Sequence, residues 1–157
     1  MNLTVQLSAV GVEDIDGILD IETASFAQPW GRLTILDELM VSDAVRLGAR
    51  TPSPQADAAL IGFLFARVLD DEMHLMKLAV DPQWRMRGAA SALLRAALAE
   101  ARRRRAVSIV VEVRSTNRGA IGFYRKAGFK TIGVRPNYYP QTGENALVMS
   151  KPLKEAS

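Results

Sequence analysis

Residues 74–113 constrain the fold most, because they place a strand, a long helix and a second strand in direct succession. The strand is expected at 74–80. From 88 or 89 to about 104 the chain is rich in Ala, Leu, Glu and Arg, the composition of a strong helix. Val107–Val113 is almost purely apolar, as a strand buried in a sheet is. This order predicts a right-handed parallel crossover through the long helix, whose inward face comprises Leu94, Leu98 and Ala101.

The other elements follow from the period of the apolar residues. Before the crossover we expect a strand at Asn2–Leu7, helices at about Glu13–Phe26 and Arg32–Val41, and strands at Ala44–Arg50 and Ala58–Leu69. After it we expect a helix at about Asn117–Lys126, ended by Ala127-Gly128, and strands at Phe129–Arg135 and Ala146–Lys151 around a turn-rich loop. In the second helix the inward residues are predicted to be Leu33, Leu36 and Met40. The sum is an α/β chain, a mixed sheet with helices on both faces.

Length and composition place the chain among ordinary soluble proteins. It has 157 residues, 48% of them hydrophobic and 24% charged, which predicts a single domain over 1–157. The longest wholly apolar stretch is Ala58–Ala66, far shorter than the roughly 20 residues of a membrane span. The first residues carry no basic leader and no apolar signal core, so we expect a cytoplasmic protein.

The residue types that are missing limit the chemistry. The chain has no cysteine and one histidine, which excludes disulfides, thiol nucleophiles and nearly every zinc site, so no metal is expected. Without a Gly-x-Ser-x-Gly motif, His74 is expected to be structural or exposed rather than catalytic. The net charge of +3 fits an anionic ligand without requiring a nucleic acid.

A short loop between strand and helix is the first candidate binding site. It spans residues 80–90, and its helix start offers backbone N–H groups and the positive end of the helix dipole to a phosphate. Gly88, Ala89 and Ala90 let a ligand approach the main chain, and Arg85 and Arg87 add charge. No P-loop or dinucleotide fingerprint is present. The alternative is a tight turn with solvated arginines.

Two residues further along the chain, Glu112 and Tyr124, could transfer protons. Glu112 is a carboxylate in an apolar strand, where burial would raise its pKa; alternatively it pairs with an arginine or faces water at a sheet edge. Tyr124 could donate a proton to a leaving thiolate, or simply pack as core beside Phe123 and Phe129. The sequence leaves both alternatives open. Asn117, which follows Ser115-Thr116, is expected to cap the helix that carries Tyr124.

Four segments in this order resemble the GNAT family of acyl-CoA-dependent N-acetyltransferases. They are Leu78-Ala79-Val80-Asp81-Pro82, Arg85-Met86-Arg87-Gly88-Ala89-Ala90, Glu112-Val113-Arg114-Ser115-Thr116-Asn117 and Phe123-Tyr124-Arg125-Lys126-Ala127-Gly128-Phe129. The order of elements agrees over essentially the whole chain. The resemblance implies the GNAT fold: a mixed, mostly antiparallel sheet of six to seven strands, helices on both faces and a splayed central strand pair.

Within the family, three segments most resemble the branch that acetylates the N-terminal alanine of a ribosomal protein: Phe26-Ala27-Gln28-Pro29-Trp30, the Glu112-Val113-Arg114-x-x-Asn117 stretch and Asn137-Tyr138-Tyr139-Pro140. The resemblance implies acetyl-CoA as donor, a protein N-terminus as acceptor, Glu112 as general base and Tyr124 as general acid. It implies that cofactor contacts come from Leu78, Ala79, Val80, Arg85, Met86, Arg87, Gly88, Ala89, Ala90, Ser91 and Asn117. Trp30, Tyr138 and Tyr139 would contact the acceptor.

Three residues depart from the family pattern and bear on cofactor affinity and acceptor preference. Ala90 replaces a usual Gly beside the pyrophosphate, Gly31 replaces a Ser or Thr helix cap, and Lys77 replaces a small or neutral residue. If Lys77 faces the acceptor, it would disfavour a basic peptide.

Two other functions stay open from the sequence. One is the same fold acting on a lysine side chain or a small amine, and the other is a non-catalytic module that binds acyl-CoA or RNA. The run Arg102–Arg105 invites an RNA interpretation, but at a helix C-terminus a solvated face is the simpler expectation, and direct nucleic-acid binding is not expected.

Overall fold

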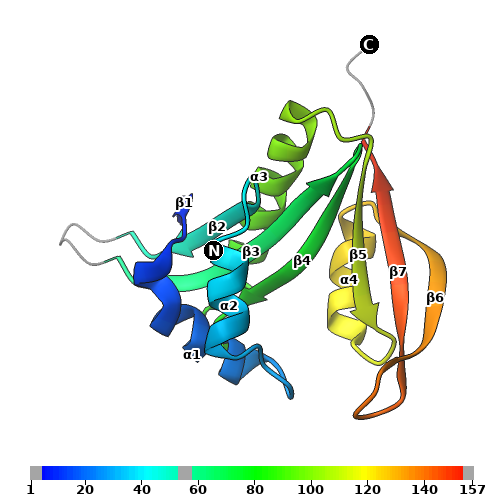
Figure 1. The fold of residues 1–157 in the computed structure, drawn as a ribbon, viewed down its shortest axis with the longest axis horizontal. Helices are drawn as coiled ribbons and strands as arrows, with labels where there is room; N and C mark the ends of the chain where they lie inside the picture. The colour runs from blue at the N-terminus through cyan, green and yellow to red at the C-terminus, as the bar shows by residue number, and fades with distance from the viewer. Residues whose placement is uncertain (1–4, 53–57, 154–157) are drawn as a thin grey trace. The chain divides into compact units, whose positions relative to one another are not determined.

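The computed structural model describes residues 5–52 and 58–153, and the statements below concern those residues. In chain order the elements are β1 (Gln6–Ala9), the 3-10 helix η1 (Val12–Asp14), α1 (Ile15–Ser25), α2 (Arg32–Leu39), β2 (Val45–Arg50), β3 (Leu60–Leu69), β4 (Glu72–Val80), η2 (Pro82–Trp84), α3 (Ala89–Arg103), β5 (Ser108–Arg114), α4 (Arg118–Lys126), β6 (Lys130–Tyr139) and β7 (Glu144–Pro152). The order is the predicted one (Figure 1). No helix in the described ranges is long and apolar enough to cross a membrane.

The strands form the predicted mixed sheet, in the order β1-β2-β3-β4-β5-β7-β6. The β1–β2, β2–β3, β5–β7 and β6–β7 pairs are antiparallel, and β4–β5 is parallel, as the crossover through α3 requires. The parallel ladder pairs only Glu72–Leu75 with Ser108–Val111, which agrees with a splayed central pair.

The chain divides into two compact units. The first unit contains residues 1–67 and 77–100, and the second contains residues 68–76 and 101–157. Because β3, β4 and α3 each run from one unit into the other, the division follows compactness and not the order of elements.

The core of the first unit lies between its strands and its N-terminal helices. Phe63 and Phe65 on β3 are fully buried with Ile18 of α1 and Ile35 of α2. On the other face of β3, a Cβ added to Gly62 would lie 3.4 Å from Leu93 of α3. Side chains alternate between the two faces of a strand, so helices cover both faces of this part of the sheet, as predicted.

The second unit is built around β5. Val110 and Val111 point to opposite faces and are both buried, so β5 is buried on both sides, as its near-continuous apolar run predicts. The helix α4 ends at Gly128, whose φ of +100° is the left-handed conformation expected of a glycine cap. The N–H of Phe129 donates to the carbonyl of Tyr124 at 3.0 Å and completes that cap.

Two predictions about local structure are wrong. In α2, Leu33 and Met40 are 77% and 74% exposed, whereas Ile35 and Leu39 are buried. An eight-residue helix shows barely two turns of pattern, so its inward face is decided by packing against its neighbours. The turn-rich loop before the last strand is also shorter than predicted, because β6 continues to Tyr139. Tyr138 and Tyr139 therefore lie on a strand.

Several predicted boundaries shift by one or two residues. The first strand is β1, displaced toward Ala9: Val5 precedes it, and residues 2–4 of the predicted Asn2–Leu7 segment lie outside the described residues. Residues 53–57 of the expected loop also lie outside them. Val107 is 50% exposed and precedes β5, which begins at Ser108.

Candidate active site

In the first unit, the predicted phosphate loop connects β4 to α3. Met86 and Gly88 both have left-handed backbones, with φ of 62° and 91°, which turn the chain sharply into the first residue of α3. The first N–H groups of a helix lack partners within it, and here they belong to the small residues Ala89, Ala90 and Ser91. A turn with this backbone and these small side chains fits a pyrophosphate.

The two arginines of this loop differ in their surroundings. The Arg85 guanidinium donates to the carbonyl of Val80 at 3.0 Å and to Ser25 Oγ at 3.1 Å, so it ties the loop to β4 and α1. Arg87 lies with its guanidinium carbon 5.2 Å from the ring centroid of Trp84. Both arginines are exposed, but Arg85 is already hydrogen-bonded within the chain, so Arg87 is the better placed of the two to meet a phosphate.

The predicted acceptor residue Trp30 lies at the centre of a small charged and aromatic group. Its backbone N–H donates to Glu22 Oε2 at 3.1 Å, and the same oxygen is 3.3 Å from Nζ of Lys77. That ammonium lies 3.8 Å from the ring centroid of Phe26 and 4.7 Å from that of Trp30. Lys77 is thus held against the rings by an ion pair with a fully buried carboxylate.

In the second unit, Glu112 lies on β5 with its side chain 28% exposed. Its Oε2 atom is 3.4 Å from Nε of Arg135, so the arginine pair that the sequence left open is present. The same oxygen is buried and accepts no hydrogen bond from the residues that the structure describes. Oε2 of Glu112 therefore faces the Arg135 cation while its capacity to accept a hydrogen bond is not filled by a described donor.

The ring pair of Tyr138 and Tyr139 lies on β6 close to this carboxylate. Their ring centroids are 5.1 Å apart, edge to face. The pKa of Tyr138 is raised, first by a hydrogen-bonding interaction with the Glu112 carboxylate. Tyr139 is covered by the Arg114 guanidinium, 3.8 Å from its ring centroid, and Arg114 in turn pairs with Glu144 at 3.3 Å. Two of the three predicted acceptor residues and the predicted base thus lie together.

Tyr124 lies inside α4's packed face. It is 6% exposed, and its ring contacts those of Phe123 and Phe129 edge to face, each with centroids 5.2 Å apart. Burial raises the pKa of the phenol well above its ordinary value of 10, so it keeps its proton at any physiological pH. Asn117 caps the same helix, and its side-chain oxygen accepts from the N–H of Ala120 at 3.1 Å, as predicted.

The structure thus places the predicted residues in two groups. Trp30 and the residues of the cofactor loop belong to the first unit, and Glu112, Asn117, Tyr124, Tyr138 and Tyr139 belong to the second. Sequence reasoning missed Glu22 and Arg135 as parts of these groups. Glu22 could have been found, because it continues the apolar stripe of Ile15 and Ile18 at helical spacing.

Comparison with known proteins identifies the family of this chain. A model of the acetyltransferase (GNAT) family matches residues 16–129, so the chain belongs to the GNAT acetyltransferase family. It is an N-acetyltransferase by this family's chemistry, and its acyl donor is acetyl-CoA.

Individual relatives make the similarity more specific. The chain is 30% identical to the ribosomal protein bS18-alanine N-acetyltransferase of Escherichia coli K12, over 94% of this chain and 97% of that protein. It is 32% identical to the corresponding enzyme of Haemophilus ducreyi, over 88% and 93%. The crystal structure of the Escherichia coli ribosomal-protein-S18-alanine N-acetyltransferase superposes with a TM-score of 0.85 at 28% identity, covering 98% of this chain and 97% of that one. Ard1 from Thermoplasma volcanium superposes equally well, with a TM-score of 0.85 at 27% identity over 98% and 100%.

Proposed function

We propose that this chain transfers the acetyl group of acetyl-CoA to the N-terminal amine of a ribosomal protein, an alanine by preference. The observation that carries the proposal is the buried Oε2 of Glu112, which accepts no hydrogen bond from the described residues and lies beside the Tyr138–Tyr139 ring pair. A carboxylate with a free acceptor position can take a proton from an amine or from a water that bridges to it. This choice of acceptor is supported by the curated relatives, which are named ribosomal protein bS18-alanine N-acetyltransferases.

Acetyl transfer requires a base because the acceptor amine is protonated near neutral pH. An α-amino group has a pKa near 8, so most of it is protonated at pH 7 and cannot attack a carbonyl. In our proposal Glu112 accepts that proton, directly or through water, and its ion pair with Arg135 orients the carboxylate. Acetyl-CoA supplies an activated thioester, so attack by the freed amine is direct and needs no covalent enzyme intermediate, which agrees with a chain that lacks cysteine.

The remaining residues bind and orient. The turn of Met86 and Gly88 and the first turn of α3 would hold the pyrophosphate, with the backbone of Leu78, Ala79 and Val80 along the pantetheine arm. Tyr124, which burial keeps protonated, would give its proton to the leaving thiolate. Trp30, Tyr138 and Tyr139 would contact the acceptor peptide.

The experiment that tests the proposal measures CoA release from acetyl-CoA with three sets of peptides. One set begins with a free alanine, a matched set is blocked at that amine, and a third set is blocked but carries lysine. We expect release with the first set only. Release with the lysine peptides or with small amines would move the acceptor within the same chemistry, and no release with any amine would leave a module that binds acyl-CoA without catalysis.

A further inference from the structure

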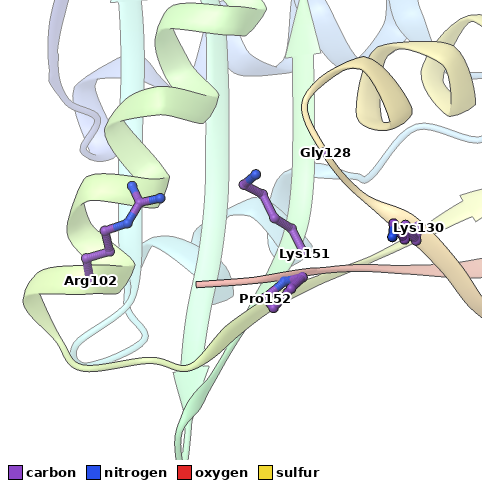
Figure 2. Close-up of a pocket in the computed structure, with 5 residues that line it drawn as sticks. All are labelled: Arg102, Gly128, Lys130, Lys151 and Pro152. Atoms are coloured by element: carbon purple, nitrogen blue, oxygen red, sulfur yellow. The ribbon is translucent and has the colours of Figure 1, made fainter. Parts of the chain in front are cut away.

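A pocket of the second unit lies away from every residue assigned above. It has a volume of ≈ 440 Å³ and is lined by Arg102 from the last turn of α3, Gly128 after α4, Lys130 at the start of β6, and Lys151 and Pro152 at the end of β7 (Figure 2). Three of its five lining residues are cations and none is an acid. The pocket therefore offers a positive site to which distant parts of the chain contribute.

The three cations of this pocket are not engaged elsewhere. Within residues 5–52 and 58–153, the side chains of Arg102, Lys130 and Lys151 make no hydrogen bond or ion pair. The acids of the second unit that are paired, Glu72, Glu112 and Glu144, have their cationic partners in His74, Arg135 and Arg114. The charge of the pocket is thus not balanced by a described carboxylate.

Gly128 is what lets one of these cations approach the backbone. An ideal Cβ at this position would lie 2.5 Å from Nζ of Lys151, so with any other residue the flexible end of the Lys151 side chain would have to shift. Figure 2 shows the Lys151 side chain rising into the space between Arg102 and Gly128. The Lys151 ammonium thus lies beside the backbone turn at Gly128.

The surroundings extend the positive field. The second unit contains 12 Lys and Arg against 6 Asp and Glu, whereas the first unit contains 8 against 11. Arg125 and Lys126 form the last turn of α4, directly before Gly128. The net charge of +3 is therefore the sum of +6 on the second unit and −3 on the first unit.

We propose that this pocket, which we call the basic pocket (Arg102, Gly128, Lys130, Lys151 and Pro152), binds a phosphate of an RNA chain. A single phosphate is far smaller than ≈ 440 Å³ and would engage few of these cations. Successive phosphates of one strand can engage the basic pocket and the cations beside it together, and several weak contacts to solvated cations then add. From the sequence alone, Arg102–Arg105 is expected to be a solvated helix end. The structure adds two further cations to this region, because folding brings Lys130 and Lys151 to the same pocket as Arg102.

The basic pocket is distinct from the proposed catalytic residues. It lies at the C-terminal end of α4, whereas Asn117 caps the N-terminal end about 13 Å away along the helix axis. On β5, Glu112 pairs with Val148 while Ile109 pairs with Lys151, a separation of about 10 Å along the strand. The inference is therefore independent of the identity of the acceptor, and RNA binding and acetyl transfer can be measured separately.

The test uses the whole purified chain and a fluorescein-labelled oligouridylate, with binding followed by anisotropy between about 50 and 200 mM salt. The pocket variant is Lys130→Gln/Lys151→Gln, and the matched control is Arg32→Gln/Arg95→Gln, which removes the same charge from exposed positions of α2 and α3. We expect the pocket variant to bind about tenfold more weakly near 0.1 M salt, with a salt slope lower by about 1.4. We expect the control to change affinity by less than about twofold, since its charges lie outside the pocket.

Each other outcome overturns the proposal. Absence of RNA binding by the unaltered chain, or equal losses in the two double variants, would mean that no site exists in the pocket. Displacement of labelled RNA by poly-glutamate as readily as by unlabelled RNA would assign an acidic protein surface, and displacement by inorganic phosphate at equal ionic strength would assign a single phosphate. Unchanged CoA release verifies that the variants are folded, and Arg102→Gln, on an exposed helix position, replaces the double variant if that variant does not fold.

Discussion

Nζ of Lys77 lies 3.3 Å from Oε2 of Glu22, which joins β4 to α1 across 55 positions of sequence. The Glu22 side chain is fully buried and that of Lys77 is 13% exposed. Burial raises the pKa of Glu22, while the Lys77 ammonium and the N–H of Trp30 act in the opposite direction. The pair fixes the segment that carries Trp30, so it bears on stability and on the proposed acceptor site alike.

Replacing Lys77 with methionine should therefore destabilise the fold. Lys77→Met leaves a buried carboxylate without its cation, and one oxygen of Glu22 already lacks a hydrogen-bond partner among the described residues. Loss of one member of a buried pair costs about 3 kcal/mol. Urea unfolding at pH 7 measures this loss. In the Glu22→Gln background the same change should cost much less, and equal costs in the two backgrounds would show that the residues are not coupled.

Asp14 and Arg50 should make stability depend on pH in the acid range. Burial raises the pKa of Asp14, but hydrogen bonds from Arg50 and from the Gly11 N–H outweigh it and leave the pKa below its usual value. An acid with a lowered pKa contributes stability above its unfolded pKa near 3.9, and that contribution is lost as the pH falls through the folded value. Asp14→Asn should cost about 2 kcal/mol at pH 7 and little near pH 2. Unfolding curves across this range check it, and a cost that does not vary with pH would contradict it.

Two glycines that flank the end of α4 should respond oppositely to alanine. At Gly122, inside the helix, an added Cβ meets nothing within 4 Å, so Gly122→Ala should stabilise by about 1 kcal/mol through helix propensity. At Gly128 the φ of +100° opposes a side chain, so Gly128→Ala should destabilise by about 1 to 2 kcal/mol. Thermal unfolding of the two variants side by side measures both signs. A gain at Gly128 would show that the left-handed cap is not needed.

Removing the carboxylate of Glu112 should slow turnover most at low pH. With Glu112→Gln the acceptor must lose its proton to solvent, which is hardest below the amine pKa near 8. We expect kcat/KM to fall by about a hundredfold near pH 6.5 and by much less at pH 9. Initial rates of CoA release with an alanine-starting peptide give the profile. A parallel profile, lowered equally at every pH, would remove Glu112 from the role of base.

The hydroxyl of Tyr124 can be removed with little effect on packing. Tyr124→Phe keeps the ring between Phe123 and Phe129, so the free energy of unfolding should change by less than about 1 kcal/mol. If the phenol is the general acid, kcat should fall by about a hundredfold while KM for acetyl-CoA stays nearly constant. Because the pKa of Tyr124 is raised, ionisation of this phenol should not lower kcat at any pH below 10. An unchanged kcat would leave Tyr124 as a core residue.

The candidate site was predictable from the sequence where its residues are near one another in the chain. The loop before α3 and the Asn117 cap follow from strand endings, small residues and helix starts, all of which are local signals. The pairing of Glu112 with Arg135 and Tyr138 was not predictable, because a two-residue shift in the β6 register would move those side chains away. That register contains an irregularity between Arg135 and Tyr139, where Asn137 takes a φ of 52°.

The sequence by itself determined the order and type of nearly every element, because the spacing of apolar residues, 3.6 residues in a helix and 2.0 in a strand, depends only on residues close together in the chain. It also determined which chemistry is open, because a chain without cysteine and with one histidine must use carboxylates, phenols and backbone groups. Only the tertiary structure decided the inward face of α2, the partner of Lys77 and the gathering of Arg102, Lys130 and Lys151. These depend on which distant surfaces meet, and that is set by packing of the whole chain and not by any local pattern.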